Sequence, residues 1–325
     1  MQRPPPPISI VIPAYKGAFL AAALASLVAQ TDRDFEVVIA DDASPAGLYQ
    51  ICRPFEPQLK LRYLRFETNL GLSCLVDHWT RAVEAAGHDW IWLMGDDDEL
   101  EPGCLAAMRA ALAAEPDWPG LWHVDVVQID AEGQPLPPAR PFAPLLSAAD
   151  YVRLRFQGGV GSFACEYLFN RLSWRERGGF LRFPLAWCSD DATWVRLAGR
   201  EGIRTVAAPL ARARWRLSGS NISAAGVESH PQKVEARLQY LEWLAGREAQ
   251  AALALRADEV IAVGRQARSW FLNSLHATRT MLLPRQRASV VRRLSAATGG
   301  VLPLVALDLL RHQRWTAAAI RESCR

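Results

Sequence analysis

Three consecutive aspartates, Asp96, Asp97 and Asp98, are the residues of this chain whose type and spacing most clearly indicate chemistry. They follow a mostly apolar run that begins at Trp90, and such a run is typical of a buried central strand. Adjacent carboxylates repel one another and are costly to hold together unless a cation compensates them. Hard divalent cations such as Mg²⁺ or Mn²⁺ choose oxygen ligands, and phosphate groups usually complete their coordination. The cluster therefore predicts a metal-assisted site for a phosphorylated ligand.

Two further acidic pairs, Asp41-Asp42 and Asp190-Asp191, also stand at the ends of apolar or aromatic stretches. A simpler interpretation is that each pair caps a helix, because an aspartate at an N-cap accepts hydrogen bonds from unpaired backbone N–H groups. That interpretation stays open for both pairs. It does not account for the cluster at residues 96–98, because capping needs only one carboxylate.

The elements expected around these clusters alternate between strands and helices. Apolar runs predict strands at 8–12, 35–40, 59–64, 90–94 and 120–129, and helical spacing predicts helices at 19–30, 73–86, 102–114 and 190–200. This alternation predicts an α/β fold whose mainly parallel sheet is flanked by helices on both faces. Ligands bind outside the carboxyl ends of the strands in such folds, which is where residues 41–42 and 96–98 fall.

The length and composition are those of a globular protein with one large domain and an appendage, or with two domains. The chain has 325 residues, of which 50% are hydrophobic and 22% are charged, and its net charge of +3 is too small to indicate a nucleic-acid partner. We expect a flexible proline-rich lead at residues 1–7, an α/β domain at 8–225 and a helical region at 226–325.

Cysteine usage and hydropathy indicate a cytoplasmic protein. The six cysteines show neither CxxC pairs nor a disulfide-dense pattern, so they are expected to be reduced thiols. The N-terminus lacks the apolar segment of a signal peptide, and no apolar run reaches the ~20 residues that span a bilayer.

The last part of the chain places arginines beside apolar residues. Within residues 289–314, arginines stand next to valines and leucines, and this pattern predicts basic amphipathic helices. One interpretation is peripheral contact with the cytoplasmic face of an anionic membrane. A packing subdomain or a dimer contact is an equally simple interpretation, and both stay open.

Several motifs in a fixed order across residues 8–225 resemble the family 2 glycosyltransferases with the GT-A fold. They are Ile10-Val-Ile-Pro-Ala-Tyr15, Phe35-Glu-Val-Val-Ile-Ala-Asp-Asp-Ala-Ser44, Asn69-Leu-Gly71, the Asp96–Asp98 cluster with Pro102, and Ser189-Asp-Asp191. The resemblance implies a Rossmann-like GT-A sheet. It also implies a metal-dependent, inverting transfer of a sugar from a nucleotide-diphosphate donor to a saccharide or lipid-linked acceptor, in surface polysaccharide biosynthesis.

The resemblance also implies roles for the residues that bind the donor. Asp41, with Asp42, would recognise the nucleotide base, and Pro13 and Tyr15 would lie beside the nucleotide. The family's first acidic position is Gly95 here, so Asp96 would take a ribose hydroxyl. Asp97 falls on the position that binds Mn²⁺ or Mg²⁺, with Asp98 in support. Tyr15 could equally be a core residue.

The remaining roles concern the transfer step. Asp191 would be the catalytic base, Asp190 would orient or bind the acceptor, and Trp187 would belong to the acceptor side. Arg216 would contact the diphosphate, because its forked donors suit phosphate geometry, although a surface arginine is the simpler interpretation.

Two other functions remain open. A sugar-phosphate nucleotidyltransferase would need a glycine-rich, basic phosphate loop after the first strand, which Pro13-Ala-Tyr-Lys-Gly17 does not supply. A non-catalytic sugar-binding or scaffold protein of the same fold is compatible with Gly95, whereas Asp97 and Asp191 argue for an enzyme.

Overall fold

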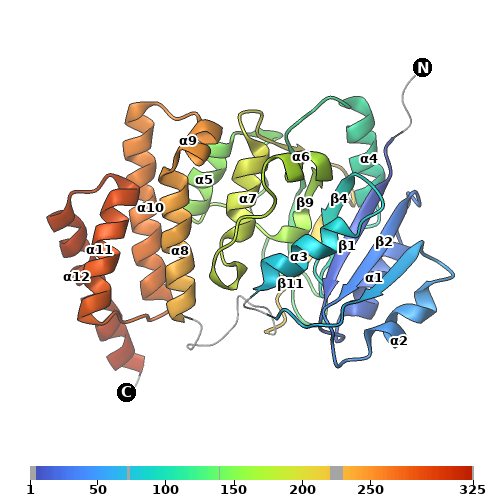
Figure 1. Ribbon diagram of the computed structural model, residues 1–325, viewed down its shortest axis with the longest axis horizontal. Helices are drawn as coiled ribbons and strands as arrows, with labels where there is room; N and C mark the ends of the chain where they lie inside the picture. Colours follow the sequence, from blue (N-terminus) through green and yellow to red (C-terminus); the bar gives the residue numbers. More distant parts are fainter. Residues whose placement is uncertain (1–4, 72–73, 139, 220–229, 324–325) are drawn as a thin grey trace.

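An eight-stranded mixed sheet forms the centre of the computed structural model, which describes residues 5–71, 74–138, 140–219 and 230–323 (Figure 1). The strands of its first half are β1 (Ile8–Ala14), β2 (Phe35–Asp41), β3 (Leu61–Arg65) and β4 (Trp90–Leu93). Strand β1 lies between β2 and β4, β3 pairs with β2, and all these pairs are parallel. The mainly parallel sheet expected from the sequence is confirmed in this half.

The second half of the sheet mixes strand directions, in the overall order β3-β2-β1-β4-β9-β6-β10-β8. Its strands are β6 (Leu121–Val124), β8 (Leu145–Leu146), β9 (Tyr167–Asn170) and β10 (Ile203–Val206). β9 is antiparallel to both β4 and β6, whereas β10 is parallel to β6. A separate three-stranded sheet has the order β5-β11-β7 and comprises β5 (Glu99–Leu100), β7 (Val126–Ile129) and β11 (Ala213–Arg216).

Helices cover both faces of the large sheet because apolar residues on its strands point to both sides. Ile10 and Ile12 of β1 pack in one core with α1 (Leu20–Val28) and α4 (Cys104–Ala114). Val11 points the opposite way, into a second core. The helices of this second core include α3 (Leu75–Glu84), α5 (Ala148–Phe156) and α7 (Ser189–Ala198). Strands buried on both faces read as continuous apolar runs, which is why the sequence revealed them.

The described residues from 230 onward are helical and form one end of the elongated molecule, drawn in orange and red in Figure 1. They comprise α8 (His230–Ala245), α9 (Arg247–Leu253), α10 (Ala257–Ala277), α11 (Pro284–Thr298) and α12 (Leu302–Ser323). Leu241, Phe271 and other residues of these helices belong to the same core as α5 and α7. No helix in the described part of the chain has both the length and the hydrophobicity needed to cross a membrane. The expected boundary at 225/226 lies outside the described residues.

Several details differ from the sequence-based expectations. The single strand predicted at 120–129 is interrupted at Asp125, whose side chain accepts a hydrogen bond from the backbone of Phe142, and β6 and β7 therefore join different sheets. The short helices α2 (Leu48–Cys52) and α6 (Arg171–Glu176) and the helix α5 were not predicted. In the lead expected to be flexible, the carbonyls of Pro5 and Pro6 accept hydrogen bonds from Arg109.

Candidate functional site

A cleft of about 740 Å³ opens at the carboxyl ends of β1, β2 and β4. Most of the site residues expected from the sequence line it: Pro13, Tyr15, Asp42, Asp96, Asp97, Asp98, Trp187, Asp190 and Asp191. Because the three strands are parallel neighbours, the residues that follow them meet at one edge of the sheet. The fold therefore gathers three acidic groups that are far apart in the sequence.

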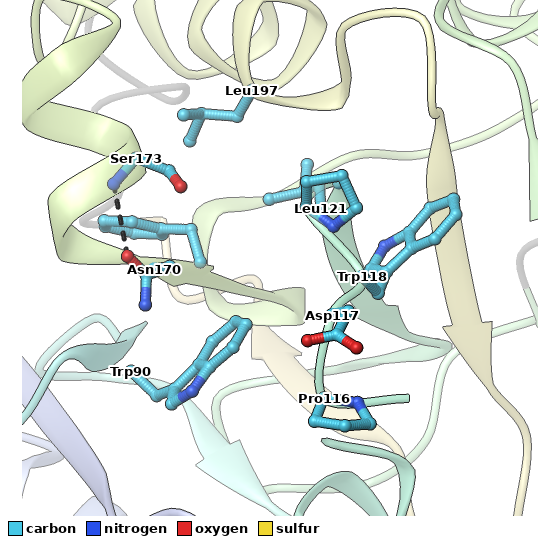
Figure 2. Close-up of a pocket in the computed structure, with 11 residues that line it drawn as sticks. Trp90, Pro116, Asp117, Trp118, Leu121, Asn170, Ser173 and Leu197 are labelled. Atoms are coloured by element: carbon cyan, nitrogen blue, oxygen red, sulfur yellow. Dashed lines mark hydrogen bonds between the residues drawn. The ribbon is translucent and has the colours of Figure 1, made fainter. Parts of the chain in front are cut away.

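A smaller pocket of about 260 Å³ lies at the other end of the sheet (Figure 2). It is lined by residues that precede or begin β4 and β6, such as Trp90, Trp118 and Leu121. Asp117 is the one ionisable residue in its lining. This pocket lacks a set of groups that could carry acid–base or metal chemistry, so the cleft is the candidate active site.

Asp96 connects the acidic cluster to the end of β1. Its carboxylate accepts hydrogen bonds from the backbone N–H groups of Tyr15 and Lys16, at 2.8 and 2.6 Å. Burial nevertheless raises the pKa of Asp96 to about 6. The expected ribose contact would therefore be made by a carboxylate that already fixes the loop after β1. Tyr15 itself is 47% exposed, which excludes the alternative of a core tyrosine.

Asp98 faces into the protein, where it anchors β11. One of its oxygens accepts a hydrogen bond from the backbone of Gly95 and the other from the backbone of Arg216, both at 3.2 Å. Burial and the neighbouring charge of Asp97 raise the pKa of Asp98. Both oxygens are thus engaged, and Asp98 supports the cluster more readily than it would bind a metal directly.

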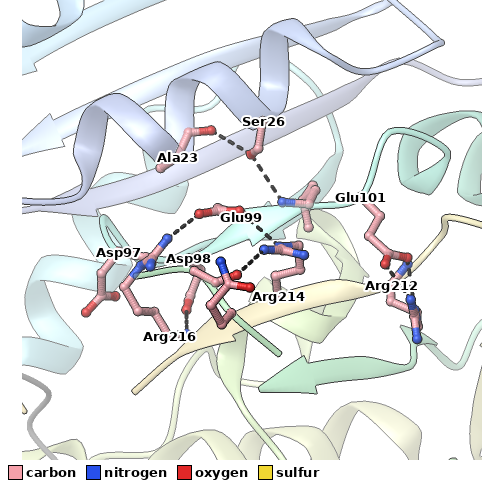
Figure 3. Close-up of polar contacts among 12 residues, drawn as sticks. Ala23, Ser26, Asp97, Asp98, Glu99, Glu101, Arg212, Arg214 and Arg216 are labelled. Atoms are coloured by element: carbon pink, nitrogen blue, oxygen red, sulfur yellow. Dashed lines mark hydrogen bonds and ion pairs between the residues drawn. The ribbon is translucent and has the colours of Figure 1, made fainter. Parts of the chain in front are cut away.

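Arg216 occupies a different place from the one expected. Its Nε donates to the carbonyl of Asp97 at 3.0 Å, its other nitrogens bind Glu99 and the carbonyls of Asp130 and Ala131, and it does not line the cleft (Figure 3). The residue is 2% exposed. This geometry does not favour a contact between Arg216 and the diphosphate, because the donors of Arg216 already hold protein acceptors. Arg216 instead fixes the backbone of the acidic cluster.

Asp97 is the member of the cluster that is best placed to bind a cation. Its carboxylate lies in the cleft, 4.0 Å from the Lys16 ammonium. Burial raises the pKa of Asp97, and the charge of Lys16 partly offsets that effect. Among the described residues, no group of three His, Cys, Asp or Glu side chains could hold a metal ion. The oxygen donors nevertheless fit Mg²⁺ or Mn²⁺, since such ions are commonly held by one or two carboxylates with substrate phosphates and water.

Asp41 ends β2 and Asp42 follows it, but only one of these two aspartates faces the cleft. Asp41 is 0% exposed and binds Arg65 and Tyr63, so the side chain expected to recognise the base lies outside the cleft. Asp42 lines the cleft, and its carboxylate accepts from the backbone N–H groups of Leu70 and Gly71 at 2.9 and 3.1 Å. The same carboxylate also pairs with Arg81. Asp42 is thus the one of the two aspartates that lines the cleft, and its contact with the base stays a prediction.

The two aspartates at the start of α7 also lie in different environments. Asp191 is bound by the Arg155 guanidinium through two hydrogen bonds of 2.9 Å and accepts a third from Tyr151. Asp190 is half-buried, lines the cleft and accepts a hydrogen bond from the backbone N–H of Asp191. Burial, followed by the charge of Asp191, raises the pKa of Asp190 to about 7. A carboxylate with such a pKa can exchange a proton near neutral pH.

Several cleft residues were not identified as candidates from the sequence. They include Asn69, His78, Arg155, Arg237 and Trp270. Asn69 stands in one of the quoted motifs and could have been found there. Arg155 and Arg237 come from helices with no local motif, so only the tertiary structure reveals them.

Residues 9–135 match the model of the family described as "Glycosyl transferase family 2". A PGL/p-HBAD biosynthesis glycosyltransferase of Mycobacterium tuberculosis is 33% identical over 124 residues, which cover 38% of this chain and 47% of that protein. The O-antigen biosynthesis protein RfbC of Myxococcus xanthus is 32% identical over 157 residues, or 46% of this chain and 12% of RfbC. The chain thus matches about half the length of the first relative and a small part of the second.

Among the solved structures that resemble this chain, two align with nearly all of it. S. aureus TarS 1–349 in complex with UDP-GlcNAc aligns with a TM-score of 0.71 and 16% identity, over 97% of this chain and 92% of TarS. The mannosyltransferase PcManGT of Pyrobaculum calidifontis, in complex with GDP-Man and Mn²⁺, aligns with a TM-score of 0.51 and 16% identity, over 95% of this chain and 87% of that one. At this identity the likeness shows the fold alone, and it confirms the expected GT-A fold.

Proposed function

We propose, from the match of residues 9–135 to the glycosyl transferase family 2 model, that the protein transfers a sugar from a nucleotide-diphosphate donor to a saccharide or lipid-linked acceptor. One observation carries the proposal. The cleft brings Asp42, Asp97 and Asp190 together from three separate segments of the chain. Base recognition, charge compensation and proton removal are the tasks that such a transfer requires.

The donor would lie along the edge formed by β1, β2 and β4. Asp42 would face the nucleotide base, Pro13 and Tyr15 would flank the nucleotide, and Asp96 would fix the loop beneath it. Asp97 would hold Mn²⁺ or Mg²⁺ together with the diphosphate. When bound, the metal acts as a Lewis acid that offsets the negative charge building on the leaving diphosphate. The complex of PcManGT with Mn²⁺ supports this part of the proposal.

The acidic pair would remove the proton from the attacking acceptor hydroxyl. The sequence resemblance assigns this task to Asp191, but the Arg155 guanidinium occupies both oxygens of that carboxylate. Asp190 is better placed, because it faces the cleft and burial raises its pKa towards neutrality. We therefore assign the base to Asp190 and a positioning role to Asp191. A single base and no covalent nucleophile give one displacement, with inversion at the anomeric carbon.

The acceptor would come from cell-envelope or surface polysaccharide biosynthesis and would meet the enzyme on the cytoplasmic side. The O-antigen biosynthesis protein RfbC supports this class of acceptor. The two other functions left open by the sequence are less favoured. A nucleotidyltransferase lacks support because Pro13-Ala-Tyr-Lys-Gly17 does not provide a glycine-rich phosphate loop, and a scaffold role does not account for the gathering of Asp97 and Asp190 in one cleft.

The direct test is calorimetric binding of UDP, GDP, dTDP and CMP, each with and without Mn²⁺. We expect one diphosphate to bind with an affinity that depends on manganese. Asp97→Ala should abolish the manganese dependence, whereas Asp117→Ala, a matched aspartate in the second pocket, should preserve it. Binding of none of the four nucleotides to the wild type would contradict the proposed function.

A further inference from the structure

Helices of the C-terminal region complete one wall of the cleft. Arg237 of α8 and Trp270 of α10 line it, together with Trp187, which precedes α7. Arg237 is 6% exposed, and its guanidinium carbon lies 5.2 Å from the centroid of the Trp187 ring. A strongly basic group is therefore buried beside the aromatic part of the cleft.

Arg237 differs from the other buried arginines of the described chain in having no carboxylate partner. Arg109 pairs with Asp32 and Asp34, and Arg216 pairs with Glu99. The Nε of Arg237 is buried without a hydrogen-bond partner. Burial lowers the pKa of Arg237, and no carboxylate acts to offset that effect. The cleft wall thus contains a desolvated cation that lacks a counter-charge within the described residues.

The contact between Arg237 and the Trp187 ring does not by itself offset the cost of burying the Arg237 charge. A cation–π contact stabilises a buried cation by less than the cost of burying that cation without a counter-charge. The Lys233 ammonium also lies near this ring, 4.7 Å from its centroid. An anion entering the cleft would supply the counter-charge that Arg237 lacks within the described residues.

We propose that Arg237, beside Trp187, forms a subsite for an anionic group of the acceptor, a phosphate or a carboxylate. This inference rests on the proposed function. Trp187 lies three residues before Asp190, so the subsite belongs to the side of the cleft that carries the proposed base. The donor diphosphate is expected elsewhere, beside Asp97. The rings of Trp187 and Trp270 would pack on the apolar face of the sugar that carries the anion.

The experiment compares Arg237→Met with the wild type and with Arg247→Met, which changes an exposed arginine of α9. Inorganic phosphate and glucuronate are titrated into each full-length protein, with and without a saturating nucleotide and Mn²⁺. Wild type and Arg247→Met should bind at least one of the two anions, and Arg237→Met should bind it at least tenfold more weakly. The preferred anion identifies the group as phosphate or carboxylate.

Thermal unfolding separates an anion site from a purely structural arginine. Without anion, Arg237→Met should unfold at the same or a higher temperature than the wild type, because the variant removes an unpaired buried charge. The anion should raise the unfolding temperature of the wild type only. Equal anion binding by wild type and Arg237→Met would overturn the inference, as would a lowered unfolding temperature of the variant without any difference in anion binding.

Nucleotide binding keeps this inference separate from the proposed function. Anion binding that depends on Arg237, in a protein that binds none of the four nucleotides, would support the subsite and contradict the glycosyltransferase proposal. Manganese-dependent nucleotide binding without any anion binding would overturn the subsite alone.

Discussion

Asp190 and Asp191 are neighbours in the sequence, but their carboxylates are not equivalent. The Arg155 guanidinium forms a two-pronged ion pair with Asp191, and such a pair favours the charged carboxylate while it occupies both oxygens. Asp190 is half-buried in the cleft wall, where desolvation favours its protonated form. In the proposed function, these contacts would divide one acidic pair into a proton acceptor and a positioning residue.

Replacing each aspartate by asparagine tests this division. Asp190→Asn should lower the rate of sugar transfer by about 10²- to 10⁴-fold, which is the usual contribution of a general base. Its thermal stability should not fall, because the variant removes a carboxylate that is costly to ionise in the fold. Asp191→Asn should destabilise the protein by about 3 kcal/mol, because it leaves Arg155 without its carboxylate. Steady-state kinetics and thermal unfolding measure both effects.

The pH profile provides the control. A base must be ionised to accept a proton, so the wild-type rate should rise with pH through about 7, the raised pKa of Asp190. Asp191→Asn should keep a rising profile, with a lower midpoint because one neighbouring negative charge is gone. A stable, inactive Asp191→Asn beside an active Asp190→Asn would return the base to Asp191.

Ion pairs between the short strands β5 and β11 hold the acidic cluster in place. Arg214 and Arg216 of β11 both bind Glu99 of β5, and Arg212 binds Glu101 (Figure 3). Because side chains alternate along a strand, arginines two residues apart share one face of β11. Strand β11, although distant in sequence, thus supports the residues that follow β4.

Arg216→Lys tests whether Arg216 supports the cluster or contacts the nucleotide. Lysine keeps the charge but loses the forked geometry, so we expect a loss of about 2 kcal/mol of stability, from hydrogen bonds to charged groups worth about 1.5–3 kcal/mol each. Nucleotide affinity should fall less than in Asp97→Ala. Chemical denaturation and calorimetry provide the two values. Arg62→Lys, on the exposed side of β3, should change neither. Loss of nucleotide affinity at unchanged stability would identify a phosphate ligand instead.

At the scale of the whole molecule, the C-terminal helices have two different faces. Their inner face packs on α5 and α7 and completes the cleft. The outer side of α12 and the residue before it expose large apolar side chains, namely Val301, Leu302, Leu304, Leu307, Leu310 and Trp315. Arg311 and Arg314 are exposed on the same helix. Apolar and basic residues on one surface are typical of helices that lie on anionic membranes, and we propose that α12 makes such a contact.

Vesicle sedimentation measures this contact. The protein should bind vesicles that contain phosphatidylserine, bind vesicles of phosphatidylcholine alone much less, and dissociate as the salt concentration rises. The double variant Arg311→Gln/Arg314→Gln should bind about 30-fold more weakly, since each basic residue near an anionic surface contributes about 1 kcal/mol.

The control for membrane binding is Arg53→Gln/Arg62→Gln, which removes two exposed arginines from the α/β part. This variant should bind vesicles like the wild type. Equal weakening by both double variants would show a general charge effect, and no binding by the wild type would leave α12 as a packing or dimer surface.

The sequence by itself determined the first half of the sheet and the acidic residues at its edge. Strands β1, β2 and β4 are buried on both faces, so they read as continuous apolar runs, and parallel strands must end at one edge. This local pattern was sufficient to predict the fold class and to place Asp96–Asp98 in a binding cleft. The antiparallel β9 and the helix α5 escaped prediction, because their positions depend on pairing and packing with distant segments.

Only the tertiary structure decided what each charged side chain does. Asp41 and Arg216 belong to motifs that suggest a site, yet each is occupied by partners from other segments: Asp41 by Tyr63 and Arg65, Arg216 by Glu99. Conversely, Arg237 stands in a helix without any motif and becomes a candidate because the fold buries it in the cleft without a carboxylate. The physical reason is that residue type fixes the charge available, whereas burial and the nearest partner fix whether that charge remains available to a ligand.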